Sequence, residues 1–212
     1  MRVFEIFRSI QGETTRAGAP MGFVRLAGCD LACAYCDAPA ARDPAAGREM
    51  TVGEVLAAVA APPLPPLPWV AVTGGEPLLQ AAEVNALIAA LLDRGRQVLV
   101  ETGGAHPIDS LDPRAVRIVD VKTPGSGMAG RMLWRNLDLV RPGDEVKFVL
   151  TSREDYEWSK GVVARHGLAG RTTVLFGPAA PLLDAAPLAR WILDDGLPVR
   201  LNLQLHKLLG LP

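Results

Sequence analysis

Short β-type runs alternate with helix-type runs along most of the chain, and this alternation restricts the possible folds more than any other feature. Apolar and β-branched runs predict strands at residues 23–26, 69–73, 98–100, 116–121, 146–150, 173–176 and 199–205. Helices are predicted between them, at residues 55–60, 78–92, 153–165 and 182–193. Repeated β-α units indicate a parallel sheet, either doubly wound or curled into a full or partial barrel. The units are too few for a full eight-stranded barrel.

Local signals mark where three of these helices begin. Thr51 and Glu54 form a capping-box pattern ahead of the first helix. Pro77 suits the first turn of the second helix, because its missing N–H has no partner to lose there. Ser152 directly precedes the third helix and is a favourable N-cap residue. We therefore expect the strand-to-helix connections to be short.

The composition is that of one folded domain spanning residues 1–212. Of these residues 49% are hydrophobic and 21% are charged, which excludes a disordered chain. The 22 basic and 23 acidic side chains nearly balance, so we expect neither nucleic acid nor a membrane as a partner. The uncharged stretch 55–75 is broken by prolines, which predict a stiff connection at residues 61–68 rather than a membrane span. Residues 1–13 lack the apolar core of a secretory signal, so we expect a cytoplasmic protein.

All three cysteines lie in one short loop, residues 28–38, directly after the strand predicted at 23–26. Cys29, Cys33 and Cys36 have the spacing CxxxCxxC. Three thiolates can hold three irons of a [4Fe–4S] cluster and leave the fourth iron open to a ligand that is not protein. Structural zinc is the alternative, but it usually takes four protein ligands, and the histidine nearest in sequence is His106. The loop therefore favours an iron–sulfur cluster in a reducing compartment.

Two motifs together resemble the radical S-adenosylmethionine enzymes. Tyr35 precedes the third cysteine of the loop, and Gly74-Gly75-Glu76-Pro77 follows a predicted strand. The glycines allow close approach of a ligand to the backbone, and Glu76 could accept from an ammonium, although an ordinary strand-to-helix turn has the same sequence features. The resemblance implies that the methionyl amino and carboxylate groups chelate the open iron. It also implies that an electron from the cluster cleaves the sulfonium to a 5′-deoxyadenosyl radical, so that no side chain need act as a nucleophile.

A narrower resemblance runs from the N-terminus to the last residue. The segments that carry it are residues 5–13, 23–29, 101–104 and 204–212. They resemble the 7-carboxy-7-deazaguanine synthases, which implies a homodimer with a shortened, modified (β/α) barrel. The implied reaction is ring contraction of 6-carboxy-5,6,7,8-tetrahydropterin to 7-carboxy-7-deazaguanine with loss of ammonia, in the synthesis of 7-deazapurines such as queuosine. The radical would take hydrogen from pterin C6 and S-adenosylmethionine would be regenerated, with flavodoxin or ferredoxin as the expected electron donor.

By position, the resemblance assigns residues to each part of the site. The cluster ligands are Cys29, Cys33 and Cys36. The implied S-adenosylmethionine contacts are Tyr35, Cys36, Asp37, Gly75, Glu76, Asp120, Val121, Lys122 and Gly177. The implied substrate contacts are Ile10, Gln11, Gly12, Glu13, Arg25, Thr73, His206 and the terminal carboxylate of Pro212.

The side chains themselves support part of this assignment. The guanidinium of Arg25 suits a substrate carboxylate because its fork binds both oxygens; an ion pair with Glu13 or Asp30 is the alternative. In the predicted strand 199–205, leucines alternate with Asn202 and Gln204, so one face is polar and could line a barrel. An edge strand facing solvent would show the same alternation.

Charged residues also alternate along two predicted strands. Asp120 shares a face with Ile118 and Lys122, and Lys147 shares another with Glu145 and Val149. These charges could reach the cofactor, or they could form an internal ion-pair network.

Four positions depart from the pattern of the resembled family. Ala38 stands where a threonine usually supports a magnesium ion, which leaves magnesium dependence open. The Gly177-Pro178 turn lacks the usual glutamine, while Thr14 and Gly103 replace a glycine and an asparagine.

Two alternative functions share parts of the pattern. A glycyl-radical activating enzyme would have the same cysteine loop and cofactor but would act on a protein backbone. A non-catalytic module would use the cysteines to hold zinc.

Overall fold

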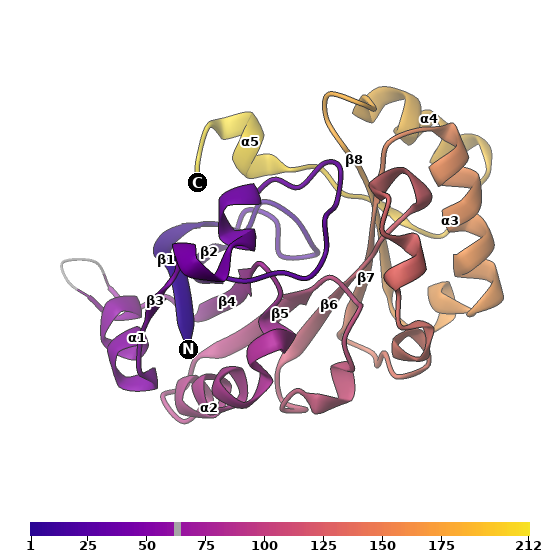
Figure 1. The fold of residues 1–212 in the computed structure, drawn as a ribbon. Helices are drawn as coiled ribbons and strands as arrows, with labels where there is room; N and C mark the ends of the chain where they lie inside the picture. Colours follow the sequence, from indigo (N-terminus) through magenta and orange to yellow (C-terminus); the bar gives the residue numbers. More distant parts are fainter. Residues whose placement is uncertain (62–64) are drawn as a thin grey trace.

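A computed structural model describes residues 1–61 and 65–212, and one curved sheet runs through it in the order β3-β1-β2-β4-β5-β6-β7-β8-β9 (Figure 1). The strands are β1 Arg2–Ile10, β2 Pro20–Leu26, β3 Arg48–Glu49, β4 Trp69–Gly74, β5 Gln97–Thr102, β6 Val116–Val121, β7 Glu145–Leu150, β8 Thr173–Pro178 and β9 Arg200–Leu201. Strand β1 pairs antiparallel with β2 and β3, and every pair from β2 to β9 is parallel. The two edge strands, β3 and β9, do not pair with each other among the described residues, which confirms the predicted partial barrel.

Helices cover the outer face of the sheet (Figure 1). They are α1 Val52–Val59, α2 Ala81–Leu92, α3 Arg153–Arg165 and α4 Ala185–Asp194. The short helix α5 Leu205–Leu209 lies instead over the open side of the barrel. Short 3-10 turns lie at Pro39–Arg42, Pro44–Ala46, Pro77–Gln80, Ile108–Ser110, Pro124–Ser126, Ala129–Arg131, Trp134–Asp138 and Leu168–Gly170. Within residues 1–61 and 65–212, no helix has both the length and the apolar character needed to cross a membrane.

The expected helix starts are confirmed at two of three places. Thr51 and Glu54 form a reciprocal capping box before α1, and Ser152 accepts the Asp155 N–H before α3. Pro77 instead opens a 3-10 turn, and α2 begins only at Ala81. The predicted proline-rich connection at 61–68 includes residues 62–64, which lie outside the described residues.

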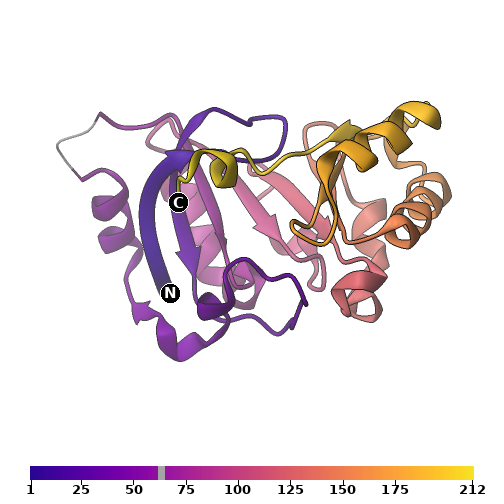
Figure 2. The same cartoon turned by 90° about the horizontal axis from the view of Figure 1, so that it is seen from above.

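Two elements at the chain ends differ from expectation. Strand β1 was not predicted, because within it only Val3 is fully buried and its sequence shows no apolar alternation. The strand predicted at 199–205 is wrong beyond Leu201, because β9 has two residues and α5 starts at Leu205. The chain leaves the sheet there and crosses its open side, as Figure 2 shows for the yellow segment.

This crossing segment, residues 202–212, joins the two sides of the open barrel. The Asn202 N–H donates to the Phe176 carbonyl of β8 at 2.8 Å, and the Leu205 N–H donates to the Gly12 carbonyl, just after β1, at 2.8 Å. Residues that are nearly 200 positions apart therefore lie side by side.

The two faces of the sheet have different roles. On the outer face, valines such as Val72 and Val100 pack under the helices in the main core. On the inner face an apolar layer closes the bottom of the barrel, formed by Met21, Phe23, Ala71, Leu99 and Ile118. Two residues further along β4, β5 and β6 the same face carries Thr73, Glu101 and Asp120. Side chains at the carboxyl ends of parallel strands are thus polar and face the barrel interior, which is where such folds place their sites.

Candidate active site

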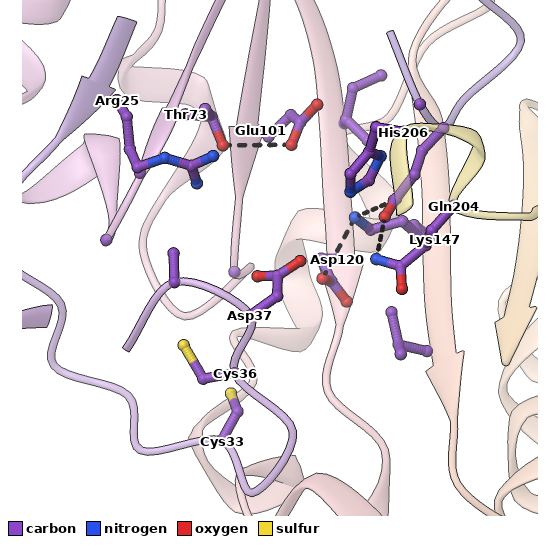
Figure 3. Close-up of a pocket in the computed structure, with 18 of the residues that line it drawn as sticks. Arg25, Cys33, Cys36, Asp37, Thr73, Glu101, Asp120, Lys147, Gln204 and His206 are labelled. Atoms are coloured by element: carbon purple, nitrogen blue, oxygen red, sulfur yellow. Dashed lines mark hydrogen bonds and ion pairs between the residues drawn. The ribbon is translucent and has the colours of Figure 1, made fainter. Parts of the chain in front are cut away.

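One open cavity at the carboxyl ends of the strands collects most of the predicted site residues. Figure 3 shows Cys33 and Cys36 at one end of it and Arg25, Thr73 and His206 towards the other. The predicted residues that line it are Ile10, Gln11, Gly12, Glu13, Arg25, Cys29, Cys33, Tyr35, Cys36, Asp37, Thr73, Gly75, Glu76, Asp120, Lys122, His206 and Pro212. Residues 194 positions apart meet at this cavity, because the crossing segment places His206 so close to Gly12 that a Cβ added to Gly12 would lie 1.7 Å from His206 Nδ1.

Two predicted cofactor residues do not line the cavity. Val121 packs in the main core, because it follows Asp120 in a strand and so points to the opposite, helix-covered face. Gly177 belongs to β8 rather than to a turn, and a Cβ added there would lie 2.8 Å from the Asn202 carbonyl oxygen. Ala179 and Ala180, directly after β8, line the cavity instead.

The cysteine loop is irregular and is held mainly by its backbone. The Gly28 N–H donates to the Ala41 carbonyl at 2.8 Å, and the Ala34 N–H donates to the Ser126 carbonyl at 3.0 Å. All three thiols are free and partly buried. Burial raises the pKa values of the Cys29 and Cys33 thiols above their ordinary value.

Within the described parts of the chain, no three His, Cys, Asp or Glu side chains lie close enough together to hold one metal ion. A [4Fe–4S] cluster has a different requirement, because each thiolate binds a different iron. Three thiols that line one shared cavity meet that requirement.

The Gly-Gly-Glu-Pro segment is shaped by its own packing. Gly74 has a φ of 133°, and a Cβ added to Gly75 would lie 2.1 Å from the Gly28 carbonyl oxygen. A larger residue at Gly75 would force the end of β4 away from the cysteine loop, and one at Gly74 would force it away from Leu26 of β2. Glu76 is fully buried, and its carboxylate accepts from Leu78 N–H at 2.9 Å, Thr102 Oγ1 at 2.8 Å and Gly103 N–H at 2.7 Å. These three hydrogen bonds hold the carboxylate even before any ligand is considered, although burial raises the pKa of Glu76.

Four charged side chains cross the cavity as an alternating row. Lys147 Nζ lies 2.7 Å from Glu13 and 3.7 Å from Asp120, and Figure 3 marks the contact between Lys147 and Asp120. Lys122 Nζ lies 2.9 Å from Asp120. Burial acts against the Lys147 ammonium, but Glu13 and Asp120 overcome it and hold the pKa of Lys147 well above its ordinary value. Burial likewise acts to raise the pKa of Glu13, and the Lys147 charge outweighs it and lowers that pKa. Asp120, Lys122 and Lys147 therefore form the internal ion-pair network left open by the sequence, and they face the cavity. Glu13 takes the place expected for Glu145, which pairs with Arg16 instead.

Arg25 lies outside this network. Its Nε is 2.8 Å from Glu5 Oε1, so the alternatives of an ion pair with Glu13 or Asp30 are wrong. Arg25 and Glu5 face each other across the β1–β2 pair, which brings their side chains to the same face. The guanidinium still lines the cavity.

The sequence placed Lys147, Asn202 and Gln204 on polar strand faces without naming their partners, and it gave Glu101 no role. Lys147 and Gln204 line the cavity, and Gln204 Nε2 donates to Glu13 Oε1 at 2.7 Å. Glu101 accepts from Thr73 Oγ1 and from Gln11 Nε2, both at 3.2 Å, and burial raises its pKa. Asn202 Nδ2 donates to Glu13 Oε2 at 3.4 Å. The signal that could have found Glu101 is the same period-two placement of polar residues on an otherwise apolar strand.

Comparison with known proteins agrees with this site. Residues 24–120 match the model of the Radical SAM superfamily. A 7-carboxy-7-deazaguanine synthase from Chlorobaculum tepidum is 45% identical over 215 residues, which cover 100% of this chain and 95% of that protein. One from Koribacter versatilis is 41% identical over 225 residues, covering 100% and 98%. The chain belongs to the 7-carboxy-7-deazaguanine synthase family.

A solved structure supports the fold. The crystal structure of QueE from Escherichia coli aligns with a TM-score of 0.78 and 21% sequence identity, covering 97% of this chain and 94% of that chain. As a member of the 7-carboxy-7-deazaguanine synthase family, the chain is an enzyme of the radical S-adenosylmethionine type. Neither the glycyl-radical activating enzyme nor the zinc module is favoured by these findings.

The cofactors of a 7-carboxy-7-deazaguanine synthase family member are a [4Fe–4S] cluster and S-adenosylmethionine, and the cavity fits both. The thiols at one end meet the ligand count of the cluster. Beside them, Asp120 Oδ1 is buried and has no hydrogen-bond partner in the described structure. A buried acceptor that faces a cavity costs free energy until a donor binds it, so this oxygen suits a hydroxyl or ammonium of the cofactor.

Proposed function

We propose that this enzyme converts 6-carboxy-5,6,7,8-tetrahydropterin to 7-carboxy-7-deazaguanine with loss of ammonia. The observation that carries the proposal is a single cavity lined both by the three cysteines and by all eight expected substrate positions. Its support is the 45% and 41% identity to relatives named 7-carboxy-7-deazaguanine synthase. The product would feed the synthesis of 7-deazapurines, including queuosine.

At the cofactor end, Cys29, Cys33 and Cys36 would hold the cluster. S-adenosylmethionine would lie between the cysteine loop and β6, near Tyr35, Asp37, Gly75, Glu76 and Lys122, which all line this part of the cavity. When bound, the two cofactors supply a 5′-deoxyadenosyl radical that can take hydrogen from pterin C6. Asp120, which pairs with Lys122 and Lys147, would accept hydrogen bonds from the cofactor through its free Oδ1.

At the substrate end, charge places the pterin. The Arg25 guanidinium would bind the 6-carboxylate through both of its oxygens. Glu13, ionised because Lys147 lowers its pKa, would accept N–H donors of the pterin ring. Burial lowers the pKa of His206, which therefore stays neutral at pH 7 and can donate one hydrogen bond. Thr73 Oγ1, the Pro212 carboxylate and the backbone of Ile10, Gln11 and Gly12 complete this end.

The same residues give a proton-handling environment without a nucleophile. Glu101 is buried against Gln11 and Thr73, and burial favours its neutral form. A carboxyl whose pKa is raised in this way could exchange a proton with a ring nitrogen of the pterin when ammonia leaves.

We propose that any magnesium ion binds weakly. Ala38 lines the cavity next to Asp37 and offers no side-chain oxygen. Magnesium would then rely on Asp37, water and the substrate, so turnover would persist without it.

We further propose that residues 1–212 form one radical S-adenosylmethionine domain, with the cluster loop at 28–38, that acts as a cytoplasmic homodimer with flavodoxin or ferredoxin as electron donor. Free thiols suit a reducing compartment. The exposed side chains of Leu208, Leu209 and Leu211 form an apolar surface that a second copy could cover.

Anaerobic reconstitution tests the reaction directly. The enzyme with iron and sulfide restored is incubated with S-adenosylmethionine, dithionite and 6-carboxy-5,6,7,8-tetrahydropterin, without magnesium, and the products are identified by mass spectrometry. We expect 7-carboxy-7-deazaguanine. 5′-Deoxyadenosine alone would show radical formation and leave the substrate open. The absence of both products, with and without magnesium, would refute the proposed function.

A further inference from the structure

The turn that carries Glu13 has an unusual backbone. Thr14 has a φ of 69°, and it is the only described residue other than glycine with a positive φ. The left-handed region is unfavourable for threonine, because its branched Cβ crowds the backbone. Such a conformation persists only where neighbouring groups hold it in place. Thr14 is also buried, at 6% exposure, so those groups belong to the interior of the enzyme.

Two buried side chains hold this turn from opposite sides. Asn202 Oδ1 accepts the Thr14 N–H at 2.8 Å. Glu145 accepts the Thr15 N–H at 3.0 Å and also lies 2.8 Å from Arg16 Nη1. Glu145 therefore fixes the residues after Thr14, while Asn202 is bonded to Thr14 itself.

Asn202 also reaches the carboxylate that the turn presents. Its Nδ2 donates to Glu13 Oε2 at 3.4 Å, and its own N–H is anchored to the Phe176 carbonyl of β8 at 2.8 Å. The side chain is 4% exposed, so its hydrogen bonds are shielded from water. One amide thus bonds the backbone next to Glu13, the Glu13 carboxylate and, through the main chain, the far side of the barrel.

We propose that Asn202 is a positioning residue for substrate binding, which holds Thr14 in its left-handed turn so that the Glu13 carboxylate faces the cavity. This inference rests on the proposed function, in which Glu13 contacts the pterin. Asn202 acts through Glu13 and does not itself line the cavity. This role predicts that the effects of substitutions at positions 14 and 202 depend on each other. Glycine at position 14 would adopt the same turn without strain, so its conformation would depend less on Asn202.

A double-mutant cycle tests the coupling. The reconstituted wild-type enzyme, Asn202→Ala, Thr14→Gly and the double variant are titrated anaerobically with 6-carboxy-5,6,7,8-tetrahydropterin, and separately with S-adenosylmethionine, by calorimetry. We expect Asn202→Ala to weaken pterin binding about 10-fold, as two lost hydrogen bonds would. Thr14→Gly should stay within about 3-fold of the wild type, and in that background Asn202→Ala should cost about 3-fold or less. S-adenosylmethionine affinity should stay within about 2-fold throughout.

Asn85→Ala is the matched control. Asn85 also bonds two backbone groups, the Ser110 carbonyl at 2.7 Å and the Asp112 N–H at 2.8 Å, but it lies on α2 outside the cavity. It should leave pterin affinity unchanged. Equal losses from Asn202→Ala in both backgrounds, or a parallel loss of S-adenosylmethionine affinity, would overturn the inference.

Thermal unfolding of the same four enzymes separates this inference from the proposed function. If the wild type binds no pterin, the proposed function fails, and the unfolding midpoints still decide whether Asn202 supports Thr14. We expect Asn202→Ala to lower the midpoint by about 2–6 °C, and by no more than half as much beside Gly at position 14. If the changes in midpoint caused by Asn202→Ala and Thr14→Gly are additive in the double variant, this result alone would overturn the inference.

Discussion

The two ends of the cavity are built in different ways. The cysteine end comes from one loop, residues 28–38, and its three thiols are free. The pterin end is drawn from both ends of the chain, and Glu13 alone accepts hydrogen bonds from Lys147, Asn202 and Gln204. The first end is completed by its ligand, whereas the second is ordered by the chain before any ligand binds. Substitutions should therefore damage ligand content at the first end, and stability together with substrate affinity at the second.

The largest effect should follow from Cys33→Ala. Two thiolates cannot hold the cluster, so we expect loss of iron and sulfide, and no cleavage of S-adenosylmethionine. The fold should survive, because the thiols make no contact on which the core depends. Iron and sulfide analysis with circular dichroism checks both points, and Glu13→Gln should keep its iron. A Cys33→Ala enzyme with full iron content would remove the basis for the cysteine end.

Lys147→Met should cause the next largest loss, because it leaves Glu13 and Asp120 without their shared cation. The side chains of Lys147 and Glu13 are only 10% and 11% exposed. Breaking a buried pair by removing one partner costs about 3–5 kcal/mol. We expect a loss of that size in the free energy of unfolding, measured by denaturant titration, together with weaker pterin binding.

Lys160→Met is the matched control for this loss. Lys160 pairs with Glu157 and Asp195 on the surface, where ion pairs contribute about 0–1 kcal/mol. Comparable losses from both lysines would mean that the row of charges in the cavity does not order the pterin end.

The same contrast explains what the sequence could predict. The strands, the capping box before α1 and the cysteine loop depend on neighbours within a few residues, so periodicity and spacing reveal them. Asp120 and Lys147 were placed on the inner strand faces by alternation alone. The part of the site that depends on near neighbours in the sequence could therefore be predicted without a structure.

The remaining features depend on distant partners. Strand β1 lacks apolar alternation, because pairing with β2 and β3 rather than burial keeps it in the sheet. Residues 202–205 alternate like a strand, yet their backbone bonds lead to Gly12 and Phe176 across the open barrel. The partner of Arg25 is Glu5, on a strand that was not predicted. Long-range pairing decides all three, and no local pattern encodes it.

Arg25→Ala should sharpen the comparison, because it removes a proposed substrate contact that lies outside the row of charges. The side chains of Arg25 and Glu5 are 22% and 43% exposed. Because such a partly exposed ion pair contributes little, the free energy of unfolding should change little. Loss of the guanidinium should lower pterin turnover roughly 100-fold, as expected when a charged partner is truncated. Slow, uncoupled cleavage of S-adenosylmethionine should remain.

The assay compares 7-carboxy-7-deazaguanine with 5′-deoxyadenosine in one reaction. Glu5→Gln, which removes the partner but keeps Arg25, should retain turnover within about 3-fold. Unchanged turnover in Arg25→Ala would place the substrate carboxylate elsewhere.

The smallest expected effect is a change in stability on substitution of Glu101. This residue lies at the pterin end, and its burial lowers the stability of the folded enzyme. Burial raises its pKa above the ordinary 4.5, against the attraction of Lys147. The folded state therefore keeps a proton that the unfolded chain releases, so this residue makes stability fall as pH rises from 4.5 through the folded pKa. Glu101→Gln cannot titrate and keeps an acceptor for Thr73. We expect its unfolding midpoint to exceed that of the wild type by roughly 2–4 °C at pH 8 and by less at pH 5. Glu83 is exposed, so Glu83→Gln should show no pH-dependent rise in the unfolding midpoint. If the midpoint of Glu101→Gln rises equally at both pH values, the ionisation of Glu101 does not destabilise the folded state.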